Sequence, residues 1–198
     1  MSSPSLDEMI AALKALPGVG QKSAQRMALH LLERDQQAAR RIAQTINDAL
    51  ETVRHCQRCR NFSDTDVCEI CRDDRREQNT ICVVETPADV YAVESSAAYR
   101  GRYFVLLGRL SPLDGYGPDQ LGLEQLEQQL AEGGIDEVIL ATSATVEGDI
   151  TAQYIADTAA RHGVSSSRLA RGIPLGGELE FVDGGTLSRA LSGRQQID

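Results

Sequence analysis

The first 55 residues of the chain place apolar side chains at a helical period, with spacings of three and four positions. This period predicts an amphipathic helix over residues 6–16, a second helix from about Gln21 and a third that ends near His55. The residues Pro17-Gly18-Val19-Gly20 end the first helix, because proline and glycine both disfavour a helix interior. The N-terminal part is therefore predicted to be helical, with one tight turn.

After residue 79 the apolar residues gather instead in short, β-branched runs. We expect strands at 80–84, 103–107 and 138–141, and helices at 87–95, 121–132, 150–162 and 186–191. Short buried strands that alternate with helices are typical of a parallel or mostly parallel sheet with helices on both faces. The chain is therefore predicted to have an α/β fold behind a helical N-terminus.

The composition is that of an ordinary globular protein, with 198 residues, 41% hydrophobic and 25% charged. No run approaches the roughly 18 apolar residues of a membrane span. Residues 1–16 lack the basic start and the apolar block of a signal peptide. We therefore expect a cytoplasmic protein without membrane contact.

The net charge of −9 is unevenly distributed along the chain. Residues 1–50 have six Lys and Arg against five Asp and Glu, and residues 51–77 have six against seven. Residues 78–198 have eight against seventeen, so they account for the acidity of the whole chain. We therefore expect the near-neutral N-terminal part and the acidic C-terminal part to have different partners.

Four of the five cysteines form two CxxC pairs, Cys56 with Cys59 and Cys68 with Cys71, separated by eight residues. Four thiolates at this spacing complete a tetrahedral Zn²⁺ shell and leave no open position, so we expect one structural zinc ion per chain. A redox pair is the alternative, although such a pair favours a single CxxC at a helix start beside a sheet. Cys82 lies in an apolar run and is predicted to be a small buried side chain.

Six arginines flank the four cysteines: Arg54, Arg58, Arg60, Arg72, Arg75 and Arg76. Two roles are open to them, contact with the thiolates and contact with DNA, and four nearby aspartates dilute the positive charge that the second role needs. The sequence leaves this choice open.

The turn Leu16-Pro17-Gly18-Val19-Gly20 has the features of an anion-binding site. Its glycines permit positive φ and the close approach of a ligand to the backbone. The N–H groups and the positive dipole end of the next helix suit a phosphate oxygen, and Lys22 and Arg26 share one helical face beside them. The segment resembles the helix-hairpin-helix module, which binds the sugar-phosphate backbone without reading bases. A plain helical hairpin used for packing is the alternative.

Three carboxylates follow predicted strands, Glu85 after the first and Glu147 with Asp149 in the loop after the strand at 138–141. Strand carboxyl ends gather functional residues in an open parallel sheet, and oxygen ligands suit Mg²⁺. The pattern resembles the Toprim fold of topoisomerases and primase-like enzymes, with Glu147-Gly148-Asp149 where those enzymes have Asp-x-Asp. The alternatives are a Mg²⁺ site, a surface for a basic protein, and solvated carboxylates with Asp149 as a helix N-cap.

The order of these motifs resembles the RecR family of bacterial recombination mediators over essentially the whole chain. Further stretches similar to that family are Ser111-Pro112-Leu113-Asp114-Gly115, Thr145-Val146-Glu147-Gly148-Asp149 and Arg171-Gly172-Ile173-Pro174-Leu175-Gly176-Gly177-Glu178-Leu179. The resemblance implies a helix-hairpin-helix DNA-binding domain at 1–55, a C4 zinc finger at 56–71, a Toprim domain at 79–174, and a Gly-rich tail with a short helix at 175–198.

The family resemblance also implies a function. It implies a non-enzymatic, nucleoid-associated protein that works with RecO and RecF at gapped DNA, independently of RecBC, to help load RecA, and that forms a ring-like homotetramer or a dimer. The residues implied to face DNA are Gly18, Gly20, Lys22 and Arg26, and those implied to meet RecO are Glu85, Glu147 and Asp149. The residues alone leave two alternatives, a zinc-dependent adaptor without DNA contact and a Mg²⁺-dependent nuclease, for which no nucleophile is evident.

Overall fold

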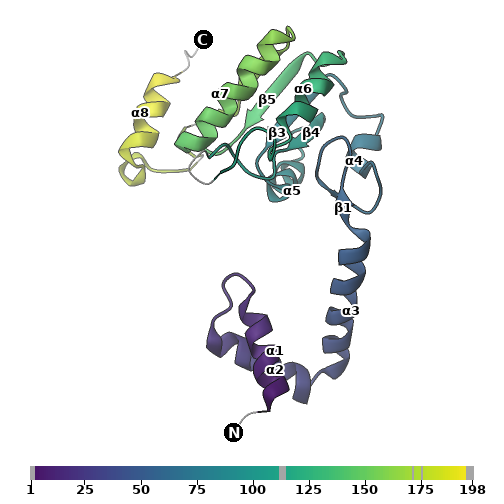
Figure 1. Cartoon of the computed structure of the whole chain (residues 1–198). Coiled ribbons are helices and arrows are strands. Elements are labelled where there is room, and N and C mark those ends of the chain that lie inside the picture. Colours follow the sequence, from purple (N-terminus) through teal and green to yellow (C-terminus); the bar gives the residue numbers. More distant parts are fainter. Residues whose placement is uncertain (1–2, 112–114, 171, 175, 195–198) are drawn as a thin grey trace. The chain divides into compact units, whose positions relative to one another are not determined.

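The computed structural model describes residues 3–111, 115–170, 172–174 and 176–194. The chain divides into two compact units, Met1–Val53 and Arg54–Asp198, and each is described by itself. Figure 1 shows the elements in chain order from the purple N-terminus to the yellow C-terminus. Part of the family-like stretch at 111–115, residues 171 and 175 and the last four residues lie outside the described residues.

The N-terminal unit consists of three helices, α1 (Pro4–Lys14), α2 (Gln21–Glu33) and α3 (Gln36–Thr52). All three were expected from the helical period of their apolar residues. A small core of Ile10, Ala24 and Ala28 joins α1 to α2, and the alanines let the two helices approach closely. The third helix ends three residues before His55, because the next residues form a strand.

Helix α3 has a strongly one-sided pattern of apolar residues, but it has no buried residue in its unit. Its apolar stripe includes Ile42, Ile46 and Leu50, and Leu50 is 79% exposed. The Asp35 side chain caps the helix by accepting a hydrogen bond of 2.8 Å from the Ala38 N–H. The stripe is therefore an ordered apolar surface on a capped helix.

The C-terminal unit contains a four-stranded parallel sheet, as predicted. Its strands are β3 (Thr80–Val84), β4 (Arg102–Val105), β5 (Glu137–Ala141) and β6 (Ser165–Arg168), in the order β4-β3-β5-β6. Apolar runs indicated the first three of these strands. The fourth has the sequence Ser-Ser-Ser-Arg, which contains no apolar residue, and it is a strand because it pairs along β5 at the sheet edge.

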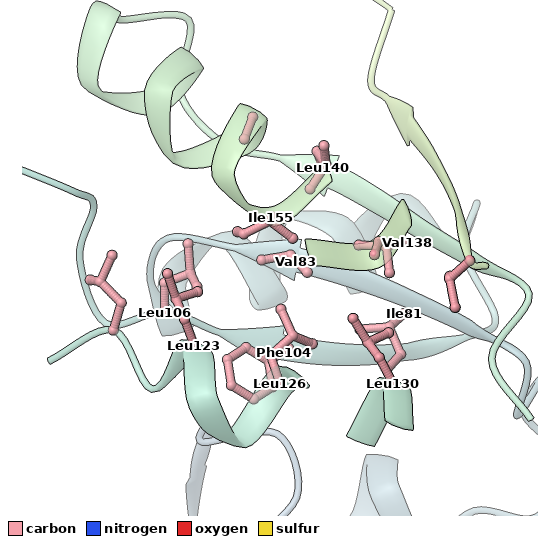
Figure 2. Packing of buried hydrophobic residues seen from close by; sticks show 14 of the residues in the cluster. Ile81, Val83, Phe104, Leu106, Leu123, Leu126, Leu130, Val138, Leu140 and Ile155 are labelled. Carbon is pink, nitrogen blue, oxygen red and sulfur yellow. The ribbon is translucent and has the colours of Figure 1, made fainter. Parts of the chain in front are cut away.

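The two faces of the sheet are covered differently. On one face, side chains from α6 (Leu123–Ala131) and α7 (Val146–Arg161) pack on the sheet. Figure 2 labels this layer: Ile81, Val83, Phe104, Leu106, Leu123, Leu126, Leu130, Val138, Leu140 and Ile155. On the other face, α5 (Pro87–Ser96) and the four cysteines pack on Cys82, Val84, Tyr103 and Val105. The expected two-sided cover is confirmed, with a small cysteine-rich segment making up part of one side.

We call that cysteine-rich segment, residues 54–72, the four-cysteine finger. It contains two short antiparallel strands, β1 (Arg54–His55) and β2 (Phe62–Ser63), and then the short helix α4 (Glu69–Arg72). At the other end of the chain, a 3₁₀ turn η2 (Leu179–Phe181) precedes α8 (Gly184–Ser192). The short helix predicted at 186–191 is therefore confirmed.

Helix α7 begins four residues before its predicted start at 150. Its N-cap is Thr145, whose hydroxyl accepts a 3.1 Å hydrogen bond from the Gly148 N–H. Glu147 and Asp149 therefore lie in the first turn of the helix, and the expectations of a loop position and of Asp149 as N-cap were wrong. The sequence pattern was ambiguous there, because Gly148 falls in the first turn and glycine disfavours a helix interior, although Thr145 is a common N-cap residue.

Candidate metal centre, hairpin and carboxylate cluster

The four predicted zinc ligands come together in the four-cysteine finger. All four cysteines are buried, and their Sγ atoms lie within 4.8 Å of one another. Among the described residues this is the one group of three or more Cys, His, Asp or Glu side chains close enough to share a metal ion. Four ligands around a tetrahedral zinc at about 2.3 Å stand about 3.8 Å apart, and Cys59 Sγ lies 3.5 Å from Cys68 Sγ.

Backbone hydrogen bonds shape the metal site. The Cys56 N–H donates to the Asn61 carbonyl (2.8 Å) and the Arg60 N–H to the Cys56 carbonyl (2.9 Å), which folds the first CxxC into a tight turn. The Cys68 N–H donates to Cys56 Sγ at 3.3 Å. Hydrogen bonds from the Cys59 and Cys71 thiols lower the pKa of Cys68, the direction that a metal-binding thiolate requires. The donor set fits one structural zinc ion, with four soft ligands and no open position.

The fifth cysteine, Cys82, is not part of this group. It is buried in β3 beneath the finger, and burial raises the pKa of its thiol to about 12. The prediction of a small buried side chain is confirmed.

The four-cysteine finger is bound to the sheet through its backbone. The Val105 N–H, on the outer edge of β4, donates to the Cys59 carbonyl at 2.8 Å. Two side chains of α6 also reach the finger, because Gln129 donates to the Arg58 carbonyl (2.7 Å) and Gln125 to the Gln57 carbonyl. The turn around the first cysteine pair therefore serves both the metal and the sheet.

Arg60 lies at the centre of this contact. Its guanidinium donates to the Leu121 carbonyl and, at 3.1 Å, to the Gln120 carbonyl, and it lies 5.8 Å from the centre of the Phe104 ring. Burial lowers the pKa of this guanidinium. The cation is accommodated because two main-chain carbonyls just before α6 accept its hydrogen bonds.

Four of the five other arginines near the cysteines also have partners within the chain, which bears on the choice that the sequence left open. Four of them have partners within the C-terminal unit: Arg54 with Asp66, Arg58 with the Cys71 carbonyl, Arg75 with Asp73 and Arg76 with Glu94. None of these contacts is to a thiolate. These four arginines therefore make their contacts within the finger, within the segment that follows it and with α5.

Replacing Gly122 with alanine is expected to loosen this contact. Gly122 has a φ of +65°, and a Cβ there would overlap the Arg60 guanidinium. Arg60 would have to leave its two carbonyls, at a cost of about 1–2 kcal/mol in the free energy of unfolding. Gly134→Ala is the matched control, since Gly134 has a φ of +81° in open space. Equal losses in urea unfolding for the two variants would show that Arg60 contributes nothing.

The N-terminal hairpin has the geometry expected of a backbone corner. Gly18 has a φ of +78°, and the Val19 N–H donates to the Leu16 carbonyl at 3.1 Å. Gly20 has a φ of −84° and is the N-cap of α2, with no side-chain cap, so only one of the two glycines uses positive φ. A Cβ at either glycine would meet no atom within 4 Å in the structure. The helix N-terminus is therefore open to a ligand.

The exposed face of α2 beside this corner is lined with basic groups. Lys22 and Arg26 lie on one face, as their spacing predicted, and the same shallow hollow is lined by His30 and Arg34. The last two were missed, although the spacing of four continues through both of them. Glu33 is the acidic member of this lining.

Two of the three predicted carboxylates, Glu85 and Asp149, contact serine and arginine side chains of the same unit. Glu85 is 13% exposed, and its Oε1 accepts hydrogen bonds of 2.8 Å from both the N–H and the hydroxyl of Ser143. Its Oε2 lies 3.8 Å from Arg109. Asp149 accepts a hydrogen bond from Arg168 at 2.9 Å, and its other oxygen lies 3.9 Å from Arg189.

These carboxylates do not fit a Mg²⁺ site. Their oxygens do not form a group of neighbouring ligands, in contrast to the four cysteines. Mg²⁺ requires near-octahedral oxygen ligands at about 2.1 Å, whereas the oxygens of Glu85 and Asp149 face Ser143 and arginines. The structure places Glu147 half-exposed in the same helix turn, separated from Asp149 by Gly148.

None of the described helices has the length and hydropathy that crossing a bilayer requires.

Known protein families match the N-terminal hairpin, the four-cysteine finger and the parallel sheet of this chain. Family models match residues 6–50 (RecR, helix-hairpin-helix), 53–73 (RecR, zinc finger domain with four cysteines), 79–170 (Toprim domain) and 172–195 (RecR, C-terminal). Recombination protein RecR of Saccharophagus degradans is 54% identical over 197 residues, which span the full length of both chains. The four-cysteine finger, the hairpin and the parallel sheet thus have counterparts in one family, and the chain belongs to the RecR family.

Proposed function

We propose that this chain is a non-enzymatic, DNA-binding recombination mediator that acts with RecO and RecF to help load RecA at gapped DNA. Membership of the RecR family supports a role in recombinational repair. In the proposal, residues 1–55 contact DNA, residues 56–71 hold zinc, residues 79–174 contact protein partners, and the tail from 175 contributes to assembly.

The observation that best supports DNA contact is the open N-terminus of α2. Gly20 caps the helix without a side chain, and Gly18 turns the backbone at positive φ, so the first N–H groups of the helix are accessible. Such a corner binds a phosphate oxygen through backbone N–H groups and the helix dipole. Lys22 and Arg26 supply cations on the adjoining exposed face. Contacts of this kind position a protein on the sugar-phosphate backbone and give no sequence preference.

A single hairpin makes few phosphate contacts, so we expect one copy to bind weakly and with strong salt dependence. Assembly of several copies, in the ring-like tetramer or dimer that the family resemblance implies, multiplies these contacts through effective concentration. The exposed apolar stripe of α3 is the kind of surface that self-association covers. The multivalent form of the proposal predicts a salt dependence steeper than one hairpin alone produces.

The acidic C-terminal unit is proposed to contact proteins. Glu85, Glu147 and Asp149 lie at the carboxyl ends of β3 and β5, the edge at which open parallel sheets bind ligands. Because Glu85 and Asp149 have arginine neighbours, Glu147 is the carboxylate that we expect to meet a basic side chain of RecO. Glu85 and Asp149 would shape that surface.

The combined variant Lys22→Ala and Arg26→Ala tests DNA contact. Loss of two phosphate contacts per engaged chain is expected to weaken binding to gapped duplex at least about tenfold, and to lower the slope of log affinity against log salt by about 2 per chain. Arg40→Ala with Arg41→Ala is the matched control, since it removes the same charge from exposed positions on α3. Unchanged binding by a folded Lys22/Arg26 variant would favour an adaptor without DNA contact.

A further inference from the structure

We propose that the carboxylate cluster at the carboxyl edge of the sheet is a guanidinium site, filled by three arginines of this chain, and that it takes no divalent cation. The three are Arg109, Arg168 and Arg189. The inference concerns the C-terminal unit alone and does not depend on DNA binding.

The first step of the argument concerns Glu85, which follows the central strand β3. One of its oxygens accepts two hydrogen bonds from Ser143, and these hold the loop between β5 and α7. The other oxygen faces the Arg109 guanidinium at 3.8 Å. A cation that took this Ser143-bound oxygen of Glu85 would displace the Ser143 N–H, and a backbone N–H left unpaired in a half-buried loop is costly.

The second step concerns Asp149, in the first turn of α7. Its Oδ1 accepts a 2.9 Å hydrogen bond from Arg168 of β6, and its Oδ2 lies 3.9 Å from Arg189 of α8. The two arginines come from different elements and approach different oxygens. Asp149 is thus the point at which the edge strand and the C-terminal helix both meet α7.

The third step is the charge balance of the cluster. Among the described residues, Arg109 lies beside Glu85 and both Arg168 and Arg189 lie beside Asp149. Guanidinium remains protonated at any pH at which the protein folds, so these arginines offset the charge of the two carboxylates that a shared cation would need. Mg²⁺ also gives up its water reluctantly and needs several well-placed oxygens in exchange. Arginine side chains need no such shell of oxygens, because each can approach a single carboxylate oxygen with an N–H donor, as Arg168 does at Asp149.

The experiment has two measurements on the full-length, zinc-loaded protein. The first follows the electron paramagnetic resonance signal of free Mn²⁺, used as a probe for Mg²⁺, during titration with protein. We expect the wild-type chain to leave that signal unchanged at millimolar Mn²⁺. Uptake of one Mn²⁺ per chain that is lost in Asp149→Asn would overturn the proposal.

The second measurement is a double-mutant cycle of Arg168→Ala and Asp149→Asn in thermal unfolding. Each variant is expected to lower the unfolding midpoint by about 2–4 °C, and the double variant by no more than the larger single effect, because both remove one interaction. Arg161→Ala, which removes the ion pair to Glu127 from the far end of α7, is the control that should add to Asp149→Asn. Additive effects for Arg168 and Asp149 would also overturn the proposal.

Discussion

Loss of zinc is expected to unfold the four-cysteine finger and to expose the outer edge of β4 as well. The finger has too few apolar residues to fold by burial alone, so the free energy of metal binding, about 10–16 kcal/mol in small zinc domains, is the source of its stability. Its first cysteine turn provides the Cys59 carbonyl that accepts the Val105 N–H, and its cysteines cover Val84 and Tyr103. The damage should therefore spread from the finger into the sheet.

Hydrogen exchange in the presence and absence of a chelator measures this spread, with zinc content determined on the same samples. We expect the Val105 amide to lose its protection when zinc is removed, or in Cys59→Ser. The matched control is Cys82→Ala, which changes a buried cysteine of the same cluster that is not a zinc ligand and should keep one zinc per chain. A zinc-free Cys59→Ser variant with a fully protected Val105 amide would contradict the prediction.

Gly148→Ala is expected to be the most destabilising single methyl addition in the C-terminal unit. Gly148 is buried in the first turn of α7, and a Cβ there would overlap the backbone carbonyl of Ser143. The obstacle is main chain, which cannot swing aside, and Ser143 is also fixed by its two hydrogen bonds to Glu85. We expect a loss of about 3 kcal/mol in the free energy of unfolding, equivalent to roughly 6–12 °C in the thermal midpoint.

Gly184→Ala provides the comparison for this effect. Gly184 is likewise in the first turn of a helix, α8, but a Cβ there meets no atom within 4 Å. Alanine favours helix formation over glycine by about 1 kcal/mol, so this control should be neutral or slightly stabilising. The thermal midpoints of the two variants and the wild type are measured by circular dichroism. Similar midpoints for Gly148→Ala and Gly184→Ala would show that the loop beneath α7 yields easily.

The sequence predicted the structure best where a local physical requirement restricts which residue types can occupy a position. Two CxxC pairs predicted the zinc ligands, because thiolate geometry fixes their spacing. Gly18 was found through the backbone angle that its turn requires, and β3 was found residue for residue from its buried apolar run. In each case the requirement is local, so a short stretch of sequence contains all the information needed.

The features that escaped prediction depend on partners far along the chain. Strand β6 is polar and exists through its pairing with β5. Arg60 appeared to be one of six equivalent arginines, and only the fold brings the Gln120 and Leu121 carbonyls to it from about 60 positions away. The environment of Asp149 likewise depends on Arg168 and Arg189, which no spacing rule connects to it. The three carboxylates were therefore identified without the arginines that determine their chemistry.

The hydrogen bond between the Cys59 carbonyl and the Val105 N–H has a consequence for biosynthesis. Residues 54–72 emerge from the ribosome before β4 emerges, so a metal-loaded finger is available as a template when that strand appears. In a zinc-starved cell the nascent strand would emerge with a bare edge, the feature that promotes pairing between chains and aggregation. Zinc supply during translation is thus expected to govern the yield of native protein.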